Sequence, residues 1–311
     1  MHSARLAHNP VLLQEMLTAL APKNGGIYVD GTFGAGGYSS AILASCQCSV
    51  IAIDQDKSVQ KYADELTKQY PKLFQLIHGN FADIGVLIKQ TGCHSVDGVV
   101  LDIGVSSMQI DTAERGFSFM KDGPLDMRMN QTNSGITAAS LIANTEEEEL
   151  ANILYLYGGE RKSRQIAKAI VNARKQTPIT STIQLATIVS GAVRSYRDAI
   201  HPATRTFQAL RIVVNAELTA LEKGLKEAIA FLAPLGRLVV VTFHSLEDSI
   251  VKRYFASLCG TKSRVNKYKA TDVHVSAYRL LNKSVISPDR QEVLTNPRAR
   301  SAKLRAIERL L

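Results

Sequence analysis

The sequence predicts an α/β protein in which a parallel, doubly wound sheet is interrupted by an inserted helical domain. Short apolar runs alternate with helical patterns over the first third of the chain, which is typical of parallel strands joined by crossover helices. The strand pattern is then absent from about residue 111 to residue 205, and it returns as one strongly apolar run, Gly236–Phe243. We therefore expect a core domain formed by residues 1–110 and 206–311, with a helical domain, residues 111–205, inserted into it.

The core begins with a short amphipathic helix over residues 10–20, and strands and helices alternate after it. Helical patterns follow the first and second strands at Ser39–Ala44 and Lys57–Tyr70, and Pro71 ends the second of them. The strands predicted in this part of the chain are apolar runs that end in a polar residue or a turn: Ile27–Asp30, Val50–Ile53, Phe74–His78 and Val96–Leu101.

The inserted domain shows helical periodicity and loops but no clear strand. Its best helical patterns are Glu146–Leu156, Arg161–Arg174 and Ile183–Val193. After the insertion, we expect the core to resume with one helix over Thr206–Leu232, followed by the buried strand named above.

Composition narrows the class of protein. Hydrophobic residues make up 45% of the 311 residues, enough to bury a full core. No stretch of about 18 apolar residues predicts a transmembrane helix, and the polar N-terminus lacks the apolar segment of a signal peptide. The four cysteines form no Cys-x-x-Cys pair, which fits a reducing compartment better than a zinc site. We therefore expect a cytoplasmic protein with no metal centre and no membrane partner.

The positive charge is concentrated in one segment. The net charge is +9, but residues 252–311 alone hold fourteen Lys or Arg against four Asp or Glu, so the rest of the chain is close to neutral. A concentrated basic segment suits a polyanion such as RNA, because phosphate contacts release counterions. The alternative is a solvated basic tail that binds nothing.

A glycine-rich loop, Asp30-Gly-Thr-Phe-Gly-Ala-Gly-Gly37, joins the first strand to a helix. Glycine at Gly34, Gly36 and Gly37 permits positive φ and lets a ligand approach the backbone. Amides at the start of the following helix can bind carboxylate or phosphate oxygens. The loop alone does not separate one nucleotide-like cofactor from another, since NAD enzymes use a similar one.

Residues at the next three strand ends indicate a nucleoside ligand. Asp54 ends the second strand, where a carboxylate can accept hydrogen bonds from both ribose hydroxyls. Phe81 follows the third strand and could border an adenine, and Asp102 ends the fourth. The loop lacks the Gly-x-Gly-x-x-Gly spacing, and no second mononucleotide-binding half follows. These features favour S-adenosylmethionine, with an NAD-dependent oxidoreductase as the alternative.

Longer motifs run through the chain in the order of one bacterial family. They are His8-x-Pro-Val-Leu-Leu-x-Glu15, Tyr28-Val-Asp-Gly-Thr-Phe-Gly-Ala-Gly-Gly37, Ala52-Ile-Asp-Gln-Asp56, Leu101-Asp-Ile-Gly-Val-Ser-Ser107, Glu114-Arg-Gly-Phe-Ser-Phe119, Gly123-Pro-Leu-Asp-Met-Arg128, His201-Pro-Ala-Thr-Arg-Thr-Phe207, Thr242-Phe-His-Ser-Leu-Glu-Asp248 and Asn296-Pro-Arg-Ala-Arg-Ser301. Through them, nearly the whole chain resembles the small-subunit ribosomal RNA (cytosine-N4)-methyltransferases of the MraW, or RsmH, family.

The resemblance implies a Rossmann-like methyltransferase core with a mostly parallel seven-stranded sheet and an inserted helical domain. It implies transfer of a methyl group from S-adenosylmethionine to the exocyclic N4 of a decoding-centre cytidine in 16S rRNA, with free rRNA or the small ribosomal subunit as partner. It leaves a homodimer open. The cofactor contacts that it implies are Gly36, Gly37, Tyr38, Asp54, Phe81, Asp102 and Gln109, and Tyr38 stands where the family usually has histidine.

The chemistry of the amine suggests roles for three further positions. The cytosine N4 amine is a poor nucleophile, so catalysis depends on alignment with the sulfonium methyl and on an acceptor for the N4 proton. We expect Asp102 to orient the cofactor or the amine, with His244 and Ser245 positioning the base. A structural role for His244, satisfying nearby backbone, is the alternative.

Four residues are candidates for contact with RNA. His201 and Arg205 lie where the insertion rejoins the core, and Arg298 and Arg300 lie in the basic segment. For the first two, structural contacts between the domains are the competing interpretation. A non-catalytic RNA-binding module and a methyltransferase acting on another nucleic acid or on protein remain alternatives at this point.

Overall fold

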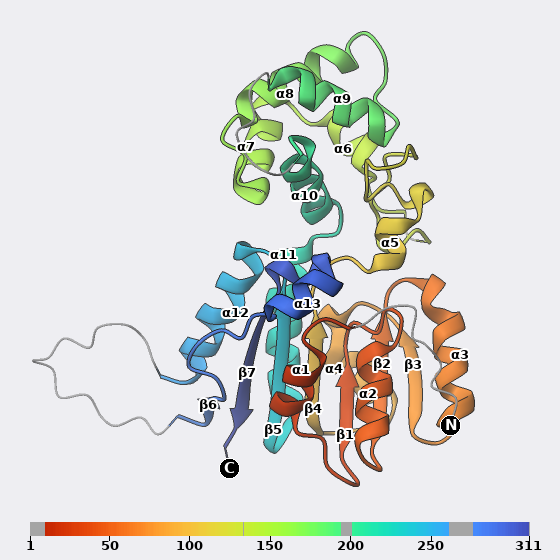
Figure 1. The fold of residues 1–311 in the computed structure, drawn as a ribbon, viewed down its shortest axis with the longest axis vertical. Coiled ribbons are helices and arrows are strands. Elements are labelled where there is room, and N and C mark those ends of the chain that lie inside the picture. The colour runs from red at the N-terminus through yellow and green to blue at the C-terminus, as the bar shows by residue number, and fades with distance from the viewer. Residues whose placement is uncertain (1–9, 133, 194–200, 261–275, 311) are drawn as a thin grey trace, which may run out of the picture. The chain divides into compact units, whose positions relative to one another are not determined.

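The chain folds around a seven-stranded sheet in the order β3-β2-β1-β4-β5-β7-β6 (Figure 1). We describe a computed structural model, which covers residues 10–132, 134–193, 201–260 and 276–310. The strands are β1 Ile27–Asp30, β2 Ser49–Asp54, β3 Phe74–His78, β4 Val96–Asp102, β5 Leu232–Thr242, β6 Tyr278–Leu280 and β7 Lys303–Arg309. Strands β1 to β5 run parallel, and β7 is antiparallel to both of its neighbours. The predicted mostly parallel, seven-stranded sheet is confirmed.

The strand order reverses between β1 and β4. The chain adds β2 and β3 on one side of β1 and then returns to add β4 on the other side. In a doubly wound sheet, this switch leaves a crevice at the carboxyl ends of the strands, which is where such folds bind ligands.

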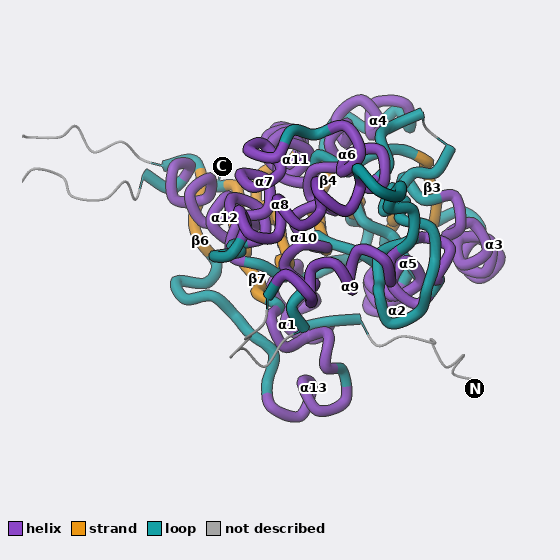
Figure 2. The backbone as a smooth tube through the Cα atoms, turned by 90° about the horizontal axis from the view of Figure 1, so that it is seen from above, coloured by secondary structure: helices purple, strands orange, loops and turns teal. Residues whose placement is uncertain are grey.

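Helices cover both faces of the sheet. Those of this part of the chain are α1 Leu13–Leu20, α2 Gly37–Ser45, α3 Gln60–Gln69, α4 Ile84–Gln90, α11 Glu217–Phe231, α12 Ser245–Leu258 and α13 Arg290–Thr295. Figure 2 shows α4, α11 and α12 on one side of the strands and α1 and α2 on the other. Ile84, Leu225 and Val251 pack with the sheet residues Val99 and Val240 in one buried cluster, so burial of the apolar strand residues holds this layer together.

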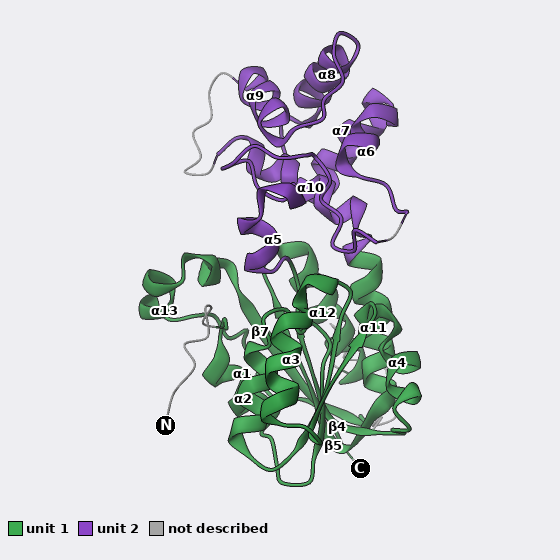
Figure 3. Ribbon diagram, turned by 90° about the vertical axis from the view of Figure 1, so that its right-hand side faces the viewer, with its two compact units in different colours: residues 1–104, 218–311 green, residues 105–217 purple. Residues whose placement is uncertain are grey.

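The chain divides into two compact units, residues 1–104 with 218–311 and residues 105–217 (Figure 3). The second unit has its own hydrophobic core, to which Leu150, Ile166, Leu185 and Phe207 contribute. Its helices are α5 Ser107–Asp111, α6 Ala138–Asn144, α7 Glu147–Gly158, α8 Ser163–Arg174, α9 Thr182–Ala192 and α10 Ala203–Val214.

The single helix predicted over Thr206–Leu232 is wrong. The structure has two helices, α10 and α11, separated at Ala216, whose φ of 47° ends a right-handed helix. Helix α10 buries Phe207 and Leu210 in the core of the inserted unit. The unit boundaries therefore lie at 104/105 and 217/218, rather than at 110/111 and 205/206.

Among the described residues, the helices are all too short or too polar to cross a membrane.

Candidate functional site

The glycine loop of residues 31–36 is tied to the strands on both sides of β1. Asp30 pairs with Ala52 of β2 and with Val100 of β4, and each of these strands continues two residues further, to Asp54 and Asp102. Because side chains alternate along a strand, the three aspartates share one face of the sheet. The structure thus brings Asp54 and Asp102 together at the carboxyl edge, on either side of the loop.

Asp54 anchors the loop through its carboxylate. The amides of Gly34 and Asp56 donate to its two oxygens, each at 2.8 Å. Burial raises the pKa of Asp54 to about 6, against the lowering effect of these amide bonds. The carboxylate is therefore ionised at neutral pH and able to accept further hydrogen bonds from a ligand.

The glycines of the loop serve different purposes. Gly34 and Gly36 have φ of 55° and 79°, the left-handed region that favours glycine. A Cβ on Gly37 would lie 2.3 Å from Cγ of Pro10, so this position is small because another part of the chain packs against it. A Cβ on Gly34 would have only the Thr32 carbonyl oxygen nearby, at 3.9 Å. Of the predicted cofactor glycines, Gly34 is thus the one whose Cα faces open space.

Tyr38, in the first turn of α2, does not offer its hydroxyl to a ligand. The side chain is buried, and the hydroxyl donates to the carbonyl oxygen of Val11. Burial, with the nearby charges of Asp102 and Asp30, holds the pKa of Tyr38 well above its ordinary value. A cofactor contact at this position would therefore be made by the backbone amide. The first amides of a helix have no acceptor within the helix itself.

Asp102 has an unusual carboxyl group. Among the described residues, no group hydrogen-bonds its buried Oδ1. Burial, followed by the negative charges of Asp30 and Glu247, raises the pKa of Asp102 to about 8. The residue's backbone amide donates to the Thr32 hydroxyl at 2.6 Å, which fixes its place beside the loop. A buried acceptor without a partner is costly unless a ligand supplies a donor.

Asp30 and Glu247 belong to the site although neither was predicted as a site residue. Asp30 is fully buried and accepts from the Ser39 hydroxyl at 2.7 Å and from the Thr32 amide at 3.2 Å. Burial raises its pKa to about 6. Its position at a strand end, like those of Asp54 and Asp102, was an available signal.

The buried Glu247 caps helix α12. One carboxylate oxygen accepts from the amides of Phe243, at 2.8 Å, and His244, at 3.3 Å. The other lies 2.8 Å from His244 Nε2, in a direction unsuited to a hydrogen bond. The spacing of His244 and Glu247 is that of a capping box, which was the available signal. Glu247 therefore fixes the backbone at His244. Ser245, the first residue of α12, is exposed.

Phe81 lies in a short 3₁₀ segment, Phe81–Asp83, whose N-cap is Asn80. Its ring packs against α11, because a Cβ on Gly224 would lie 2.6 Å from Cδ2 of the ring. The residue is half-buried, so part of it stays exposed just after the carboxyl end of β3.

Three predicted residues lie in the second unit. Gln109 is buried, and its side chain accepts from the Ser106 amide at 3.1 Å in a capping box. His201 stacks on Phe119, with ring centroids 4.5 Å apart, and its Nδ1 accepts from the Ala203 amide at the start of α10. Arg205 is half-buried on α10. These contacts give His201 and Gln109 structural roles within their own unit.

The positive charges of the basic C-terminal segment differ in how deeply they are buried. Arg305 and Lys303 face Asp248, at 2.7 Å and 3.4 Å, and so serve the fold. Arg298 and Arg300 are exposed on a 3₁₀ segment, Pro297–Ser301. Since Lys303 pairs with Thr242 at the end of β5, that segment lies at the carboxyl edge of the sheet. Four basic residues, Lys262, Arg264, Lys267 and Lys269, lie outside the described residues.

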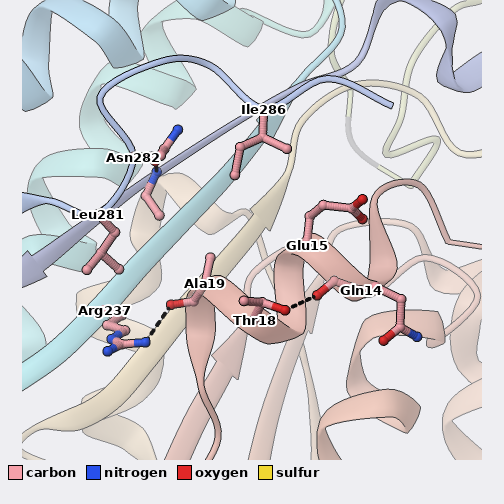
Figure 4. A pocket seen from close by; sticks show the side chains of 9 residues that line it. Gln14, Glu15, Thr18, Ala19, Arg237, Leu281, Asn282 and Ile286 are labelled. Carbon is pink, nitrogen blue, oxygen red and sulfur yellow. Dashed lines mark hydrogen bonds between the residues drawn. The ribbon is translucent and has the colours of Figure 1, made fainter. Parts of the chain in front are cut away.

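A cleft of about 400 Å³ lies beside α1 in the first unit (Figure 4). Two of its polar side chains bond to the backbone: Arg237 donates to the Ala19 carbonyl at 3.0 Å, and Asn282 accepts from the Ala306 amide at 2.8 Å. Ile286 and Leu281 complete an apolar lining. None of the strand-end aspartates lines this cleft.

Comparison with known proteins decides the family. The model of the MraW methylase family matches residues 5–310. The chain belongs to this family. It is 53% identical over 305 residues to the ribosomal RNA small subunit methyltransferase H of Wolbachia sp. subsp. Drosophila simulans (strain wRi), covering 98% of this chain and all of the relative. It is 51% identical to the protein of that name from Ehrlichia ruminantium (strain Welgevonden), covering 97% of this chain and 99% of the relative.

The family resemblance predicted from the motifs is therefore confirmed, and this MraW-family chain is an S-adenosylmethionine-dependent methyltransferase. The residues present fit that cofactor. Asp54 offers a carboxylate for ribose hydroxyls, Gly34 leaves its Cα open, and Asp102 has a buried oxygen in need of a donor. The NAD-dependent alternative has no support in this family.

Proposed function

We propose that this chain methylates the exocyclic N4 of a decoding-centre cytidine in 16S rRNA. The near-complete match to the MraW family and to relatives named ribosomal RNA small subunit methyltransferase H supports the RNA substrate. The observation that supports an amine as the acceptor is Asp102, a buried carboxyl at the end of β4 with one oxygen unsatisfied. An amino group is a donor that such an oxygen can accept from.

The chain's own residues would hold the reactants and the proton. S-adenosylmethionine supplies the activated methyl group, and Gly34, Asp54 and the first amides of α2 would hold it. Ionised Asp102 would accept a hydrogen bond from the N4 amine, which localises the nitrogen lone pair, and would then take up the proton. Glu247 would fix the turn that carries His244 at the same edge.

The pH dependence follows from the role of Asp102. Acceptance of a proton requires the ionised form, and the pKa of Asp102 is about 8. We therefore expect kcat/KM for S-adenosylmethionine, which reports the free enzyme, to rise steeply from pH 6, to reach half its maximum near pH 8 and to level off above about pH 9. Initial rates with labelled cofactor over this range measure the profile. A flat profile would argue against Asp102 as the acceptor.

The RNA interface is proposed to include Arg298 and Arg300, and also His201 and Arg205 in the inserted unit. The double substitution Arg298→Ala and Arg300→Ala should weaken RNA binding and reduce the slope of log affinity against log salt by about two, one for each lost phosphate contact. A control of equal charge is Lys252→Ala with Lys283→Ala, both exposed. If both pairs change the slope equally, the arginines have no special role.

The experiment that tests the function is mass mapping of small-subunit rRNA from cells with and without this gene. We expect one cytidine to lose a methyl group and purified enzyme to restore it as N4-methylcytidine. Transfer of the methyl group to a ring carbon of the cytidine, to another nucleic acid or to protein would reject the proposal. Three further predictions accompany this proposal. The substrate is free rRNA or the assembled small subunit, the enzyme forms a homodimer, and it is cytoplasmic.

A further inference from the structure

Three residues that precede α1, Pro10–Leu12, pack against the start of α2; we call them the N-terminal strap. Cγ of Pro10 takes the space of a Cβ on Gly37, as described above. The carbonyl of Val11 accepts the hydroxyl of Tyr38, and both side chains are buried. The strap thus covers the turn of α2 whose amides would meet the cofactor.

The other side of the strap is tied to the C-terminal segment. The amide of Leu12 donates to Oε1 of Glu292, in α13, at 2.7 Å. Leu12 is fully buried and has a φ of 52°, a left-handed conformation that is unfavourable for leucine. Such a conformation persists only where the surroundings hold it, and the bond to Glu292 is part of that restraint.

Helix α13 is itself fixed and leads directly to the exposed arginines. Asp289 caps it by accepting from the Glu292 amide at 2.7 Å. The 3₁₀ segment with Arg298 and Arg300 follows α13 in the chain. A continuous series of contacts therefore runs from α2 through the strap to the segment proposed to bind RNA.

We propose that Tyr38 and Glu292 are positioning residues for the cofactor: through the N-terminal strap, they hold the first turn of α2 in its binding conformation. The inference rests on the proposed cofactor contacts with the first amides of α2, at Gly37 and Tyr38. Without the strap bonds, the turn would have to be ordered when the cofactor binds, and that cost lowers affinity. The chemical step needs no contact with either side chain, so the turnover rate at saturating cofactor should change little.

The test uses Tyr38→Phe, Glu292→Ala and Glu292→Gln in the full chain. Calorimetry gives the Kd of S-adenosylhomocysteine, and steady-state rates give KM for S-adenosylmethionine and kcat separately. Tyr38→Phe and Glu292→Ala should raise Kd and KM by about tenfold, as the loss of one hydrogen bond implies, with kcat nearly unchanged. Glu292→Gln retains an acceptor for the Leu12 amide and should bind like wild type.

Tyr28→Phe is the matched control. Tyr28 is also buried, and its hydroxyl accepts from the Lys23 amide at 2.8 Å. Tyr28 lies on β1, but Lys23 precedes that strand, so this hydrogen bond is made at the amino end of β1, away from the glycine loop. The Tyr28→Phe substitution should lower the melting temperature without changing the Kd for S-adenosylhomocysteine.

Three results would overturn the inference: unchanged cofactor affinity in Tyr38→Phe, an equal loss of affinity in Tyr28→Phe, or cofactor binding by Glu292→Gln as weak as that by Glu292→Ala. Should Tyr38→Phe fail to fold, the Glu292 pair decides. Cofactor binding by an enzyme that methylates no rRNA would reject the proposed function alone.

Discussion

Replacing Asp102 by asparagine should reduce methyl transfer by at least about a hundredfold, the usual contribution of a positioned general base. Asparagine keeps the size of the side chain but cannot take a proton from N4. The fold should persist, because the carboxyl makes no hydrogen bond through Oδ1 among the described residues and the backbone bond to Thr32 is unaffected. Single-turnover transfer of labelled methyl to rRNA measures the loss.

The Asp102→Asn variant should also become more stable than wild type as pH rises, because wild type loses stability and the variant does not. The pKa of Asp102 is raised in the folded state to about 8 from an ordinary value of 3.8. Stability present below pH 3.8 is therefore lost as pH rises toward 8, because the unfolded chain ionises more easily. Asparagine does not ionise, so its advantage over wild type in melting temperature should grow from pH 5 to pH 8. A constant difference across that range, or near-normal turnover, would contradict the role given to Asp102.

Replacing Asp54 by alanine should weaken cofactor binding by about a hundredfold, because charge-assisted hydrogen bonds contribute about 1.5–3 kcal/mol each. The substitution removes the proposed acceptor for the ribose hydroxyls and also frees the amides of Gly34 and Asp56. The two losses act on the same loop, so the effect should appear in the Kd for S-adenosylhomocysteine, measured by calorimetry.

Asp97→Asn is the control for Asp54→Ala. Asp97 accepts from the Ile27 amide at 2.9 Å and pairs with Lys23, so it too fixes a strand, but at the amino end of β1. Its substitution should lower stability and leave the Kd unchanged. Equal loss of affinity in both variants would mean that Asp54 acts only through the fold.

The sequence predicted the sheet and its strand-end carboxylates because both are local signals. Each of the first four strands is an apolar run followed by a polar residue or turn, and this local pattern is what predicts Asp54 and Asp102 as cofactor contacts. Parallel strands then place such residues at one edge without further information. The helices of the insertion were predictable from periodicity for the same reason.

What the sequence could not predict depends on contacts between distant residues. The break at Ala216 is a single backbone conformation within a continuous helical pattern, and no local signal in the sequence marks it. Gly37 was interpreted as room for a ligand, whereas Pro10 fills the space. The bond between Leu12 and Glu292 spans almost the whole chain, and no local pattern indicates it.

A crystal structure of the chain with S-adenosylhomocysteine would test the location of the cofactor site most directly. We expect the ribose hydroxyls on the Asp54 carboxylate and the ligand between that residue and Asp102, over the loop that begins at Gly31. Ligand density in the cleft beside α1, or anywhere that leaves Asp54 and Asp102 without contact to it, would show that the carboxyl ends of β2 and β4 are not where this enzyme binds its methyl donor.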